Sequence, residues 1–435
     1  MREMGAVKGV EFVNHARARS LVAAVGGVGL ACILLAHPAA AADDEELAAI
    51  RAENRALAAQ LERLEGELTA LKQAVASNTG AVAGAGVPAV PQNVVQSGND
   101  AVALTLYGQV SRVLMGADNG DEARWFHADN DYAETHIGIE GSTALDDDWD
   151  AGARIEVQFE SNSSADVTIN QNNATIASNS FTERVLELWF ANEKAGTFVL
   201  GQGETPTDGI TGTDLSGTGT VQGLGVDSLG SALTFANADG TSSGIAIGDV
   251  VNDFAGLGRD DRIGYWSPEM GGFTVGVSHV DGDARDIALF YAGEFDGIEV
   301  EGGAGFAESS AKDGEDVYGG SVSVRIPAGT SLTASWGGAS RDAANATDPE
   351  MVFFKVAQDV DWIDQGATSL GLDWYEGSDI GQAGDEANSY SAAIVQHFDE
   401  TGAEVYATWR RFSLDRTAAS LQDIDVVAAG ATIGF

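Results

Sequence analysis

The sequence predicts an all-β transmembrane barrel of about sixteen antiparallel strands, preceded by an α-helical coiled-coil segment and a flexible linker. Three observations lead to this prediction. Residues 101–435 consist of short segments in which apolar and polar residues alternate, separated by clusters of Gly, Asp, Asn and Ser. Short and long connections alternate between these segments. Ahead of them, residues 43–76 follow a heptad pattern.

The composition suits one-sided strands rather than a packed apolar core. Of 435 residues, 55 are Gly and only 7 are Pro, and 44% are hydrophobic although the mean hydropathy is -0.05. Acidic residues outnumber basic ones by 66 to 23, which gives a formal net charge of -43. Such a charge argues against nucleic acid as a partner.

The first residues, 1–42, are expected to be a secretory signal peptide. Arg17 and Arg19 precede an apolar run over 20–36, and small residues follow it. A membrane anchor helix and a lipidated Cys32 are the alternatives; the run is short for an anchor, and it continues past the cysteine. Cys32 is the only cysteine in the sequence, so cleavage would leave no thiol and no disulfide.

Residues 43–76 are predicted to form a coiled coil. Core positions recur with alternating spacings of three and four, and charged residues and Gln stand between them. Asn54 occupies an a position, where a buried amide fixes register and oligomer number. Residues 77–100, which mix Gly, Ala, Pro and Ser, are expected to be a flexible linker. The predicted core of the coil is Leu47, Ile50, Asn54, Leu57, Leu61, Leu64, Leu68, Leu71 and Val75.

The remaining residues, 101–435, are predicted to form the barrel. Segments such as 104–110 and 154–160 alternate with period two, which is typical of strands with one apolar face. Aromatic residues such as Trp189 and Trp266 lie near segment ends, as expected at membrane interfaces. The long connections are expected at 161–180, 204–258, 339–350 and 376–386.

Four segments resemble the trimeric Gram-negative porins. Residues 106–110 resemble the first porin strand and 136–142 the second, although the porins usually have a basic residue in place of His136. Residues 262–273 resemble a porin hairpin, and Phe435 matches the final aromatic residue. The predicted coiled coil at residues 43–76 resembles that of a porin subgroup with an N-terminal coiled coil. The resemblance implies a homotrimer embedded in outer-membrane lipid, with a periplasmic coiled coil, that passes small hydrophilic solutes and ions.

The resemblance also implies a long loop that folds into the lumen and carries carboxylates facing basic residues on the wall. The insertion 204–258 is the candidate, and its expected constriction residues are Glu204, Asp208, Asp214 and Asp227. Strand alternation, together with family positions, predicts the wall residues. These are His136, Glu140, Arg154, Glu156, Arg184, Gln202, Arg259 and Arg262. For each loop acid the alternative is plain solvation, and for each arginine it is a salt bridge that only stiffens the barrel.

Channel selectivity depends on pore width and on the charges that line the pore. The negative net charge, together with Gln202 where the porins often have Arg, predicts a preference for cations. The alternatives are a substrate-specific channel and an envelope-tethering barrel whose coiled coil contacts the cell wall. Polar inward residues on nearly every strand would favour an open channel, whereas a plugged barrel would tolerate apolar ones.

No catalytic group, cofactor or paired metal motif is expected. The six histidines are scattered without a His-x-x-x-His spacing, and the neighbours Ser278 and His279 would point to opposite faces of a strand. Acidic runs at 118–122, 129–131 and 281–283 could bind divalent cations at surface loops. They lack the twelve-residue calcium loop, so solvated acids are the simpler interpretation.

Overall fold

The computed structural model describes residues 98–99, 101–171, 181–309, 315–341, 347–417 and 419–435. The chain divides into two compact units, Met1–Val94 and Val95–Phe435, and every described residue belongs to the second. The predicted signal peptide and coiled coil lie outside the described residues, as does nearly all of the predicted linker.

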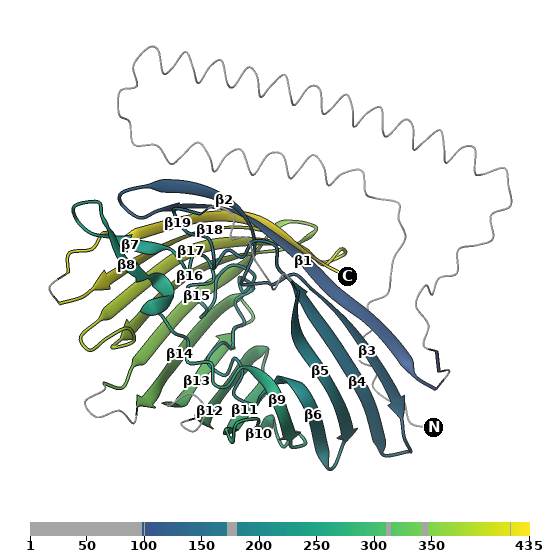
Figure 1. Ribbon diagram of the computed structural model, residues 1–435. Helices are drawn as coiled ribbons and strands as arrows, with labels where there is room; N and C mark the ends of the chain where they lie inside the picture. The colour runs from purple at the N-terminus through teal and green to yellow at the C-terminus, as the bar shows by residue number, and fades with distance from the viewer. Residues whose placement is uncertain (1–97, 100, 172–180, 310–314, 342–346, 418) are drawn as a thin grey trace, which may run out of the picture. The chain divides into compact units, whose positions relative to one another are not determined.

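The second unit is built of β-strands (Figure 1). No helix among its described residues is long and apolar enough to cross a membrane. The strands of its main sheet are β1 (Ala103–Asp118), β2 (Ala123–Asp129), β3 (His136–Ala144), β4 (Trp149–Phe159), β5 (Phe181–Asn192), β6 (Gly196–Glu204), β9 (Arg259–Trp266), β10 (Phe273–Val280), β11 (Arg285–Phe295), β12 (Ile298–Glu308), β13 (Glu315–Arg325), β14 (Thr330–Arg341), β15 (Glu350–Ile363), β16 (Gly366–Ser378), β17 (Glu386–Phe398), β18 (Ala403–Asp415) and β19 (Ile424–Gly434).

The sheet closes into a barrel because β1 pairs with β19 along Gln109–Asp118. On its other side β1 pairs with two short strands, with β3 along its first half and with β2 along its second. The seventeen strands of the sheet therefore occupy sixteen places around the ring, all antiparallel. A closed ring has no edge strand with unpaired backbone groups. A sheet that crosses a bilayer must be closed in this way. The predicted barrel of about sixteen strands is confirmed, whereas β2 was missed by the sequence reasoning.

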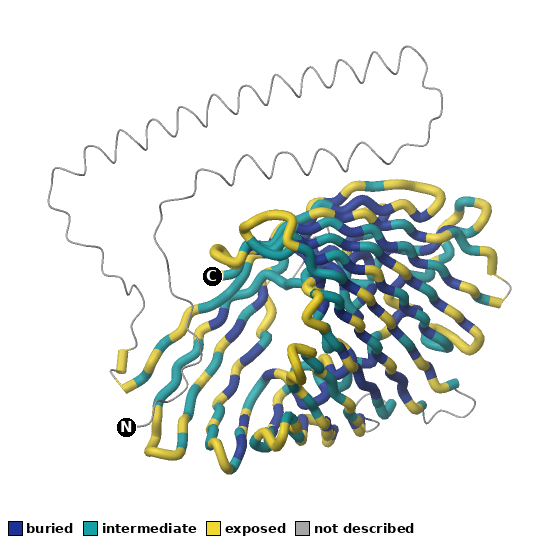
Figure 2. The backbone as a smooth tube through the Cα atoms, turned by 180° about the vertical axis from the view of Figure 1, so that it is seen from behind, coloured by how far each residue is buried: buried dark blue, intermediate teal, exposed yellow. Residues whose placement is uncertain are grey.

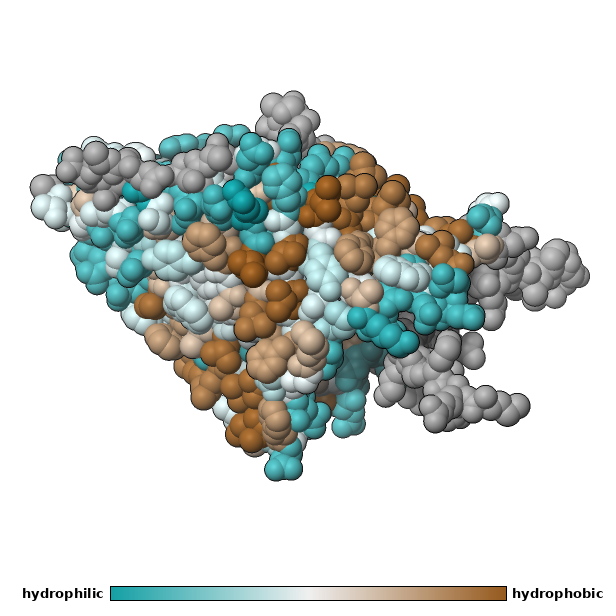
Figure 3. Space-filling view, turned by 90° about the horizontal axis from the view of Figure 1, so that it is seen from below, coloured by the Kyte–Doolittle hydropathy of each residue, from teal (hydrophilic) through white to brown (hydrophobic). Residues whose placement is uncertain are grey.

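Neighbouring rows of residues face opposite sides of the wall, as strand pleating requires. Leu200 pairs with Leu188 and Ile263, and all three side chains are exposed on the outer face. One residue further, Gly201 pairs with Glu187 and Arg262, which are buried inside the barrel. Figure 2 shows this alternation of buried and exposed positions along the strands, and Figure 3 shows apolar side chains gathered in patches on the surface.

The connection from β6 to β9, residues 205–258, is the long insertion expected from the sequence. It contains the short strands β7 (Thr234–Ala236) and β8 (Ser242–Ala246) and the 3-10 helix η1 (Ile247–Asp249). We call these residues the inner loop, because they hydrogen-bond to inward-facing side chains of β11, β13, β15 and β17. The loop therefore lies against the inside of the barrel over a long stretch of the wall.

Apolar residues of the inner loop pack against apolar inward residues of the wall. The loop contributes buried side chains such as Leu229, Leu233 and Phe235. The wall contributes Met115, Phe126, Phe353, Phe412 and Val426 from β1, β2, β15, β18 and β19. This side of the barrel interior is thus a hydrophobic core, which the sequence reasoning did not predict.

Candidate functional site

The first cluster of charges on the inner wall is centred on Arg184. Its guanidinium forms ion pairs with the carboxylates of Glu134 and Glu156, the latter at 2.6 Å, and donates to the side-chain oxygen of Gln158 at 3.1 Å. The hydroxyl of Tyr107 on β1 donates to the second oxygen of Glu156 at 2.9 Å. Two glutamates therefore share one arginine on this part of the wall.

A β-bulge explains why Arg184 reaches the inside. Glu156 pairs with Val185 and Val157 pairs with Glu183, so Arg184 is the extra residue of the bulge. Simple alternation would place Arg184 on the same face as Leu186, whose side chain is exposed outside. Bulges turn side chains in this way. Arg184, which the sequence reasoning expected on the wall, thus reaches the inner face through a bulge and not through simple alternation.

The second cluster is the reverse of the first, with one glutamate between two arginines. The two carboxylate oxygens of Glu187 on β5 lie 2.9 Å from Nη2 of Arg154 on β4 and 2.7 Å from Nη2 of Arg262 on β9. Gly203 leaves room for this arrangement, because a Cβ there would lie 2.9 Å from both Glu187 and Arg262. Glu187 and Glu134 were missed by the sequence reasoning, although alternation with Leu186 and Leu188 on the same strand would have pointed to Glu187.

Three more of the predicted wall residues are His136, Glu140 and Arg259. Nδ1 of His136 donates to the backbone oxygen of Glu134 at 2.8 Å, and Glu140 stands opposite Arg154 in the β3–β4 register. Arg259 lies 3.4 Å from the carboxylate of Glu204, where β9 and β6 meet the inner loop.

Gln202 is not where the sequence reasoning placed it. It pairs with Leu186 on one side and Asp261 on the other, and Leu186 is exposed on the outer face. Directly paired residues of an antiparallel sheet lie on the same face. Gln202 therefore belongs to the outer face, and its lack of charge has no bearing on the basic character of the inner wall.

The four predicted constriction carboxylates have different surroundings. Asp214 is paired with the buried ammonium of Lys355 on β15, at 2.7 Å. Asp227 accepts from Ser231 at 2.9 Å, and burial raises its pKa. Burial also raises the pKa of Asp208, to about 6, while Arg259 opposes the shift and Glu204 adds to it. Asp208 and the half-exposed Glu204 are thus the two of the four that lie near Arg259.

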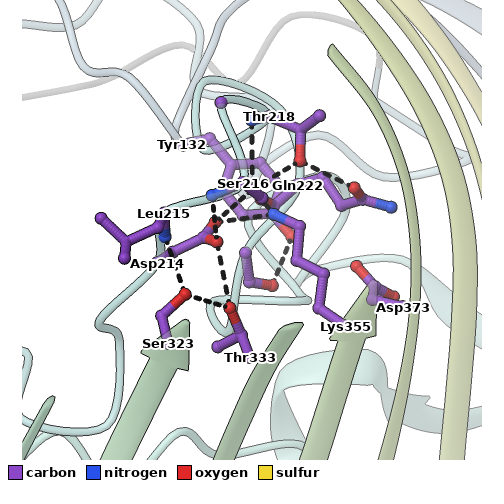
Figure 4. Close-up of polar contacts among 12 residues, drawn as sticks. Tyr132, Asp214, Leu215, Ser216, Thr218, Gln222, Ser323, Thr333, Lys355 and Asp373 are labelled. Atoms are coloured by element: carbon purple, nitrogen blue, oxygen red, sulfur yellow. Dashed lines mark hydrogen bonds and ion pairs between the residues drawn. The ribbon is translucent and has the colours of Figure 1, made fainter. Parts of the chain in front are cut away.

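Beneath the inner loop the wall offers a row of polar side chains (Figure 4). Lys355 also donates to the backbone oxygen of Gln222 at 2.7 Å, and Gln222 donates to Ser391 at 2.7 Å. Arg410 binds Asp373 through both terminal nitrogens, at 3.1 and 2.7 Å, with both side chains buried. In register across β13 to β18, the row consists of Ser323, Thr333, Lys355, Asp373, Ser391 and Arg410.

Within the described ranges, no group of three or more His, Cys, Asp or Glu side chains could hold a metal ion. Residues of two of the acidic runs accept hydrogen bonds from protein groups. Asp118 and Asn119 accept from backbone amides of their own turn. Asp129 accepts from Ser161 and from the backbone amide of Asn162.

A family model described as Gram-negative porin matches residues 74–417. No curated protein matches the sequence. Among solved structures, an anion-selective porin from Comamonas acidovorans is similar at 14% identity and a TM-score of 0.53, covering 77% of this chain and 100% of that chain. OmpT, an outer membrane protein of Vibrio cholerae, is similar at 14% identity and 0.52, covering 79% and 100%. OprB of Pseudomonas putida is similar at 9% identity and 0.53, covering 77% and 94%. At these identities the solved structures show a shared fold.

Proposed function

We propose that this chain, which belongs to the Gram-negative porin family, forms an outer-membrane channel that favours cations. The family and the closed barrel make it a channel for passive diffusion through the outer membrane. Family membership alone does not say whether the channel prefers cations or anions. That preference depends on the charges on the inner wall and the inner loop.

The observation that supports cation preference is the pairing of every arginine in the two wall clusters. Arg154, Arg184 and Arg262 are matched by Glu134, Glu156 and Glu187, so these six side chains carry no net charge. Unpaired wall arginines would attract anions, but here they are compensated. Glu140 adds negative charge beside them, and the net charge of -43 gives the surrounding field the same sign.

The test is the reversal potential of the purified protein in a planar lipid bilayer under a potassium chloride gradient. In a cation-preferring channel the reversal potential has the sign of the potassium equilibrium potential. A reversal potential with the sign of the chloride equilibrium potential would overturn the proposal.

We also propose that the protein is a homotrimer and that residues 43–76 form a periplasmic stalk that holds it together. The resemblance to porins with a coiled coil supports this proposal. Migration on a gel before and after heating tests the trimer. Deletion of 43–76 tests the stalk, since conductance steps should then change from three coupled pores to one. If three coupled steps remain, the alternative in which the coiled coil grips the cell wall gains support.

A substrate-specific channel is the second candidate, and the apolar core behind the inner loop favours it. A loop that fills one side of the barrel leaves less room for solutes than a bare barrel would. Single-channel recordings with sugars, organic acids and divalent cations separate the two candidates. Block by one class at low concentration indicates a specific site, whereas conductance that depends only on solute size indicates a general pore.

A further inference from the structure

The turn at residues 216–220 of the inner loop rests on a pair of titratable side chains. His397 on β17 and Glu404 on β18 stand directly opposite each other in the sheet. Nε2 of His397 lies 2.9 Å from the backbone oxygen of Gly217, and Thr220 donates its hydroxyl hydrogen to Glu404. The two side chains thus hold the turn at both of its ends.

The contacts of His397 require a proton on each ring nitrogen. Nδ1 lies 3.0 Å from a carboxylate oxygen of Glu404, which only accepts hydrogen bonds when ionised. Nε2 faces the carbonyl oxygen of Gly217, which also only accepts. A neutral imidazole has one N–H group and could satisfy only one of these partners. The arrangement is therefore that of an imidazolium.

The other neighbours of His397 agree with this assignment. The hydroxyl of Ser369 on β16 lies 3.2 Å from Nε2, but it donates its hydrogen to Asp359 on β15 at 2.6 Å. Towards His397 that hydroxyl can therefore only accept. The charged groups around His397 are Glu404 and Asp359, and Asp359 lies 3.6 Å from Arg325. Residues 215–222 of the loop contain no titratable side chain.

The turn approaches the wall so closely that only glycine fits at its centre. Gly217 has a φ of 71°, and a Cβ there would lie 2.4 Å from the hydroxyl oxygen of Ser369. Glycine alone adopts that conformation without strain. The close approach is what brings the Gly217 carbonyl within reach of His397.

We propose that His397 and Glu404 are positioning residues for the inner loop, and that they hold its turn only while His397 is protonated. Loss of a proton leaves a ring nitrogen lone pair facing the oxygen of Gly217 or of Glu404, and that contact becomes repulsive. Histidine ordinarily loses its proton near neutral pH. The turn is then released into the channel as pH rises. The effect on conduction rests on the proposed function, in which the loop narrows the pore.

The first measurement is the motion of the turn itself in the full chain. A spin label is attached at Gly219→Cys, where a side chain meets no atom within 4 Å, with Cys32→Ser as the background. The label is expected to become more mobile between roughly pH 6 and pH 8. In His397→Gln, mobility should stay at its high-pH level throughout. An identical pH profile in the native chain and in His397→Gln would overturn the proposal.

Two further variants keep the test decisive if His397→Gln does not fold. Gly217→Ala and Glu404→Gln should each give high mobility at acid pH, while His279→Gln on β10 should keep the native profile. A native profile in Glu404→Gln would also overturn the proposal. Open-channel current noise is then recorded over the same pH range. If the label responds to His397 but the noise does not, the positioning role stands and the loop does not narrow the pore.

Discussion

Nζ of Lys355 lies 2.7 Å from a carboxylate oxygen of Asp214, and this contact ties the inner loop to β15 across the barrel interior. The side chain of Lys355 is 1% exposed and that of Asp214 is 15% exposed. Asp214, which the sequence reasoning placed at the constriction, is thereby neutralised by the wall. The pair is a structural link, since it replaces a charge facing solutes with a buried ion pair.

Replacing Lys355 with methionine should destabilise the barrel strongly. The substitution leaves Asp214 partly buried without its cation, and removing one partner of a buried pair costs about 3 to 5 kcal/mol. The free energy of unfolding, measured with a chemical denaturant in detergent, checks this. The matched control is Lys194→Met on an exposed turn, and the double variant Lys355→Met/Asp214→Asn should recover part of the loss. Equal stability of the two single variants would contradict the role of the pair.

Replacing Glu187 with glutamine should shift selectivity towards anions. Glutamine keeps the shape but removes the charge that compensates Arg154 and Arg262. Reversal potentials under a salt gradient check this expectation. Arg184→Gln should shift selectivity the other way, because it leaves Glu134 and Glu156 uncompensated. Glu183→Gln, which pairs with Val157 on the outer face, is the control; a shift as large as that of Glu187→Gln would refute the assignment.

Replacing Gly371 with alanine should weaken the contact between the inner loop and the barrel wall. A Cβ at Gly371 would lie 2.0 Å from the side-chain oxygen of Gln222 and 3.0 Å from the hydroxyl of Thr218. Gln222 would have to give up its bonds to Thr218 and Ser391, at about 1 kcal/mol each. Unfolding free energies of Gly371→Ala and of Gly219→Ala, where space is open, provide the comparison. Equal values would show that the loop has room to shift.

Cation preference should increase with pH around the pKa of Asp208. Burial raises the pKa of this carboxyl to about 6 from its ordinary 3.8, so its folded form is neutral in acid and charged above that value. Because the folded state binds this proton more tightly than the unfolded state, stability falls as pH rises from the lower value to the higher one and is level beyond it. The permeability ratio of potassium to chloride, recorded from pH 5 to pH 7, is the readout.

Asp208→Asn is the control for this pH dependence. Asparagine cannot ionise, so the rise in the permeability ratio should disappear while the barrel remains folded. A rise of the same size in Asp208→Asn would assign the titration to another group.

The barrel itself could be predicted from the sequence, because period-two alternation is a local property of the chain. Segments starting near Trp149, Phe181, Phe273 and Ala403 are strands in the structure. The strand β2 escaped notice because its seven residues, from Ala123 to Asp129, are fewer than those of its neighbours and pair with only part of β1. The expectations for residues 1–42 and 43–76 stay predictions.

The site depended on relationships that the sequence does not contain. A bulge opposite Glu156 turned Arg184 inward, and register with Leu186 turned Gln202 outward. Which acid neutralises which base was decided by residues far apart in the chain, as with Asp214 and Lys355. Alternation by itself determined that the chain forms strands with one apolar face. Strand register, bulges and the path of the inner loop decided which charges face solutes, because these depend on how distant segments pair and pack.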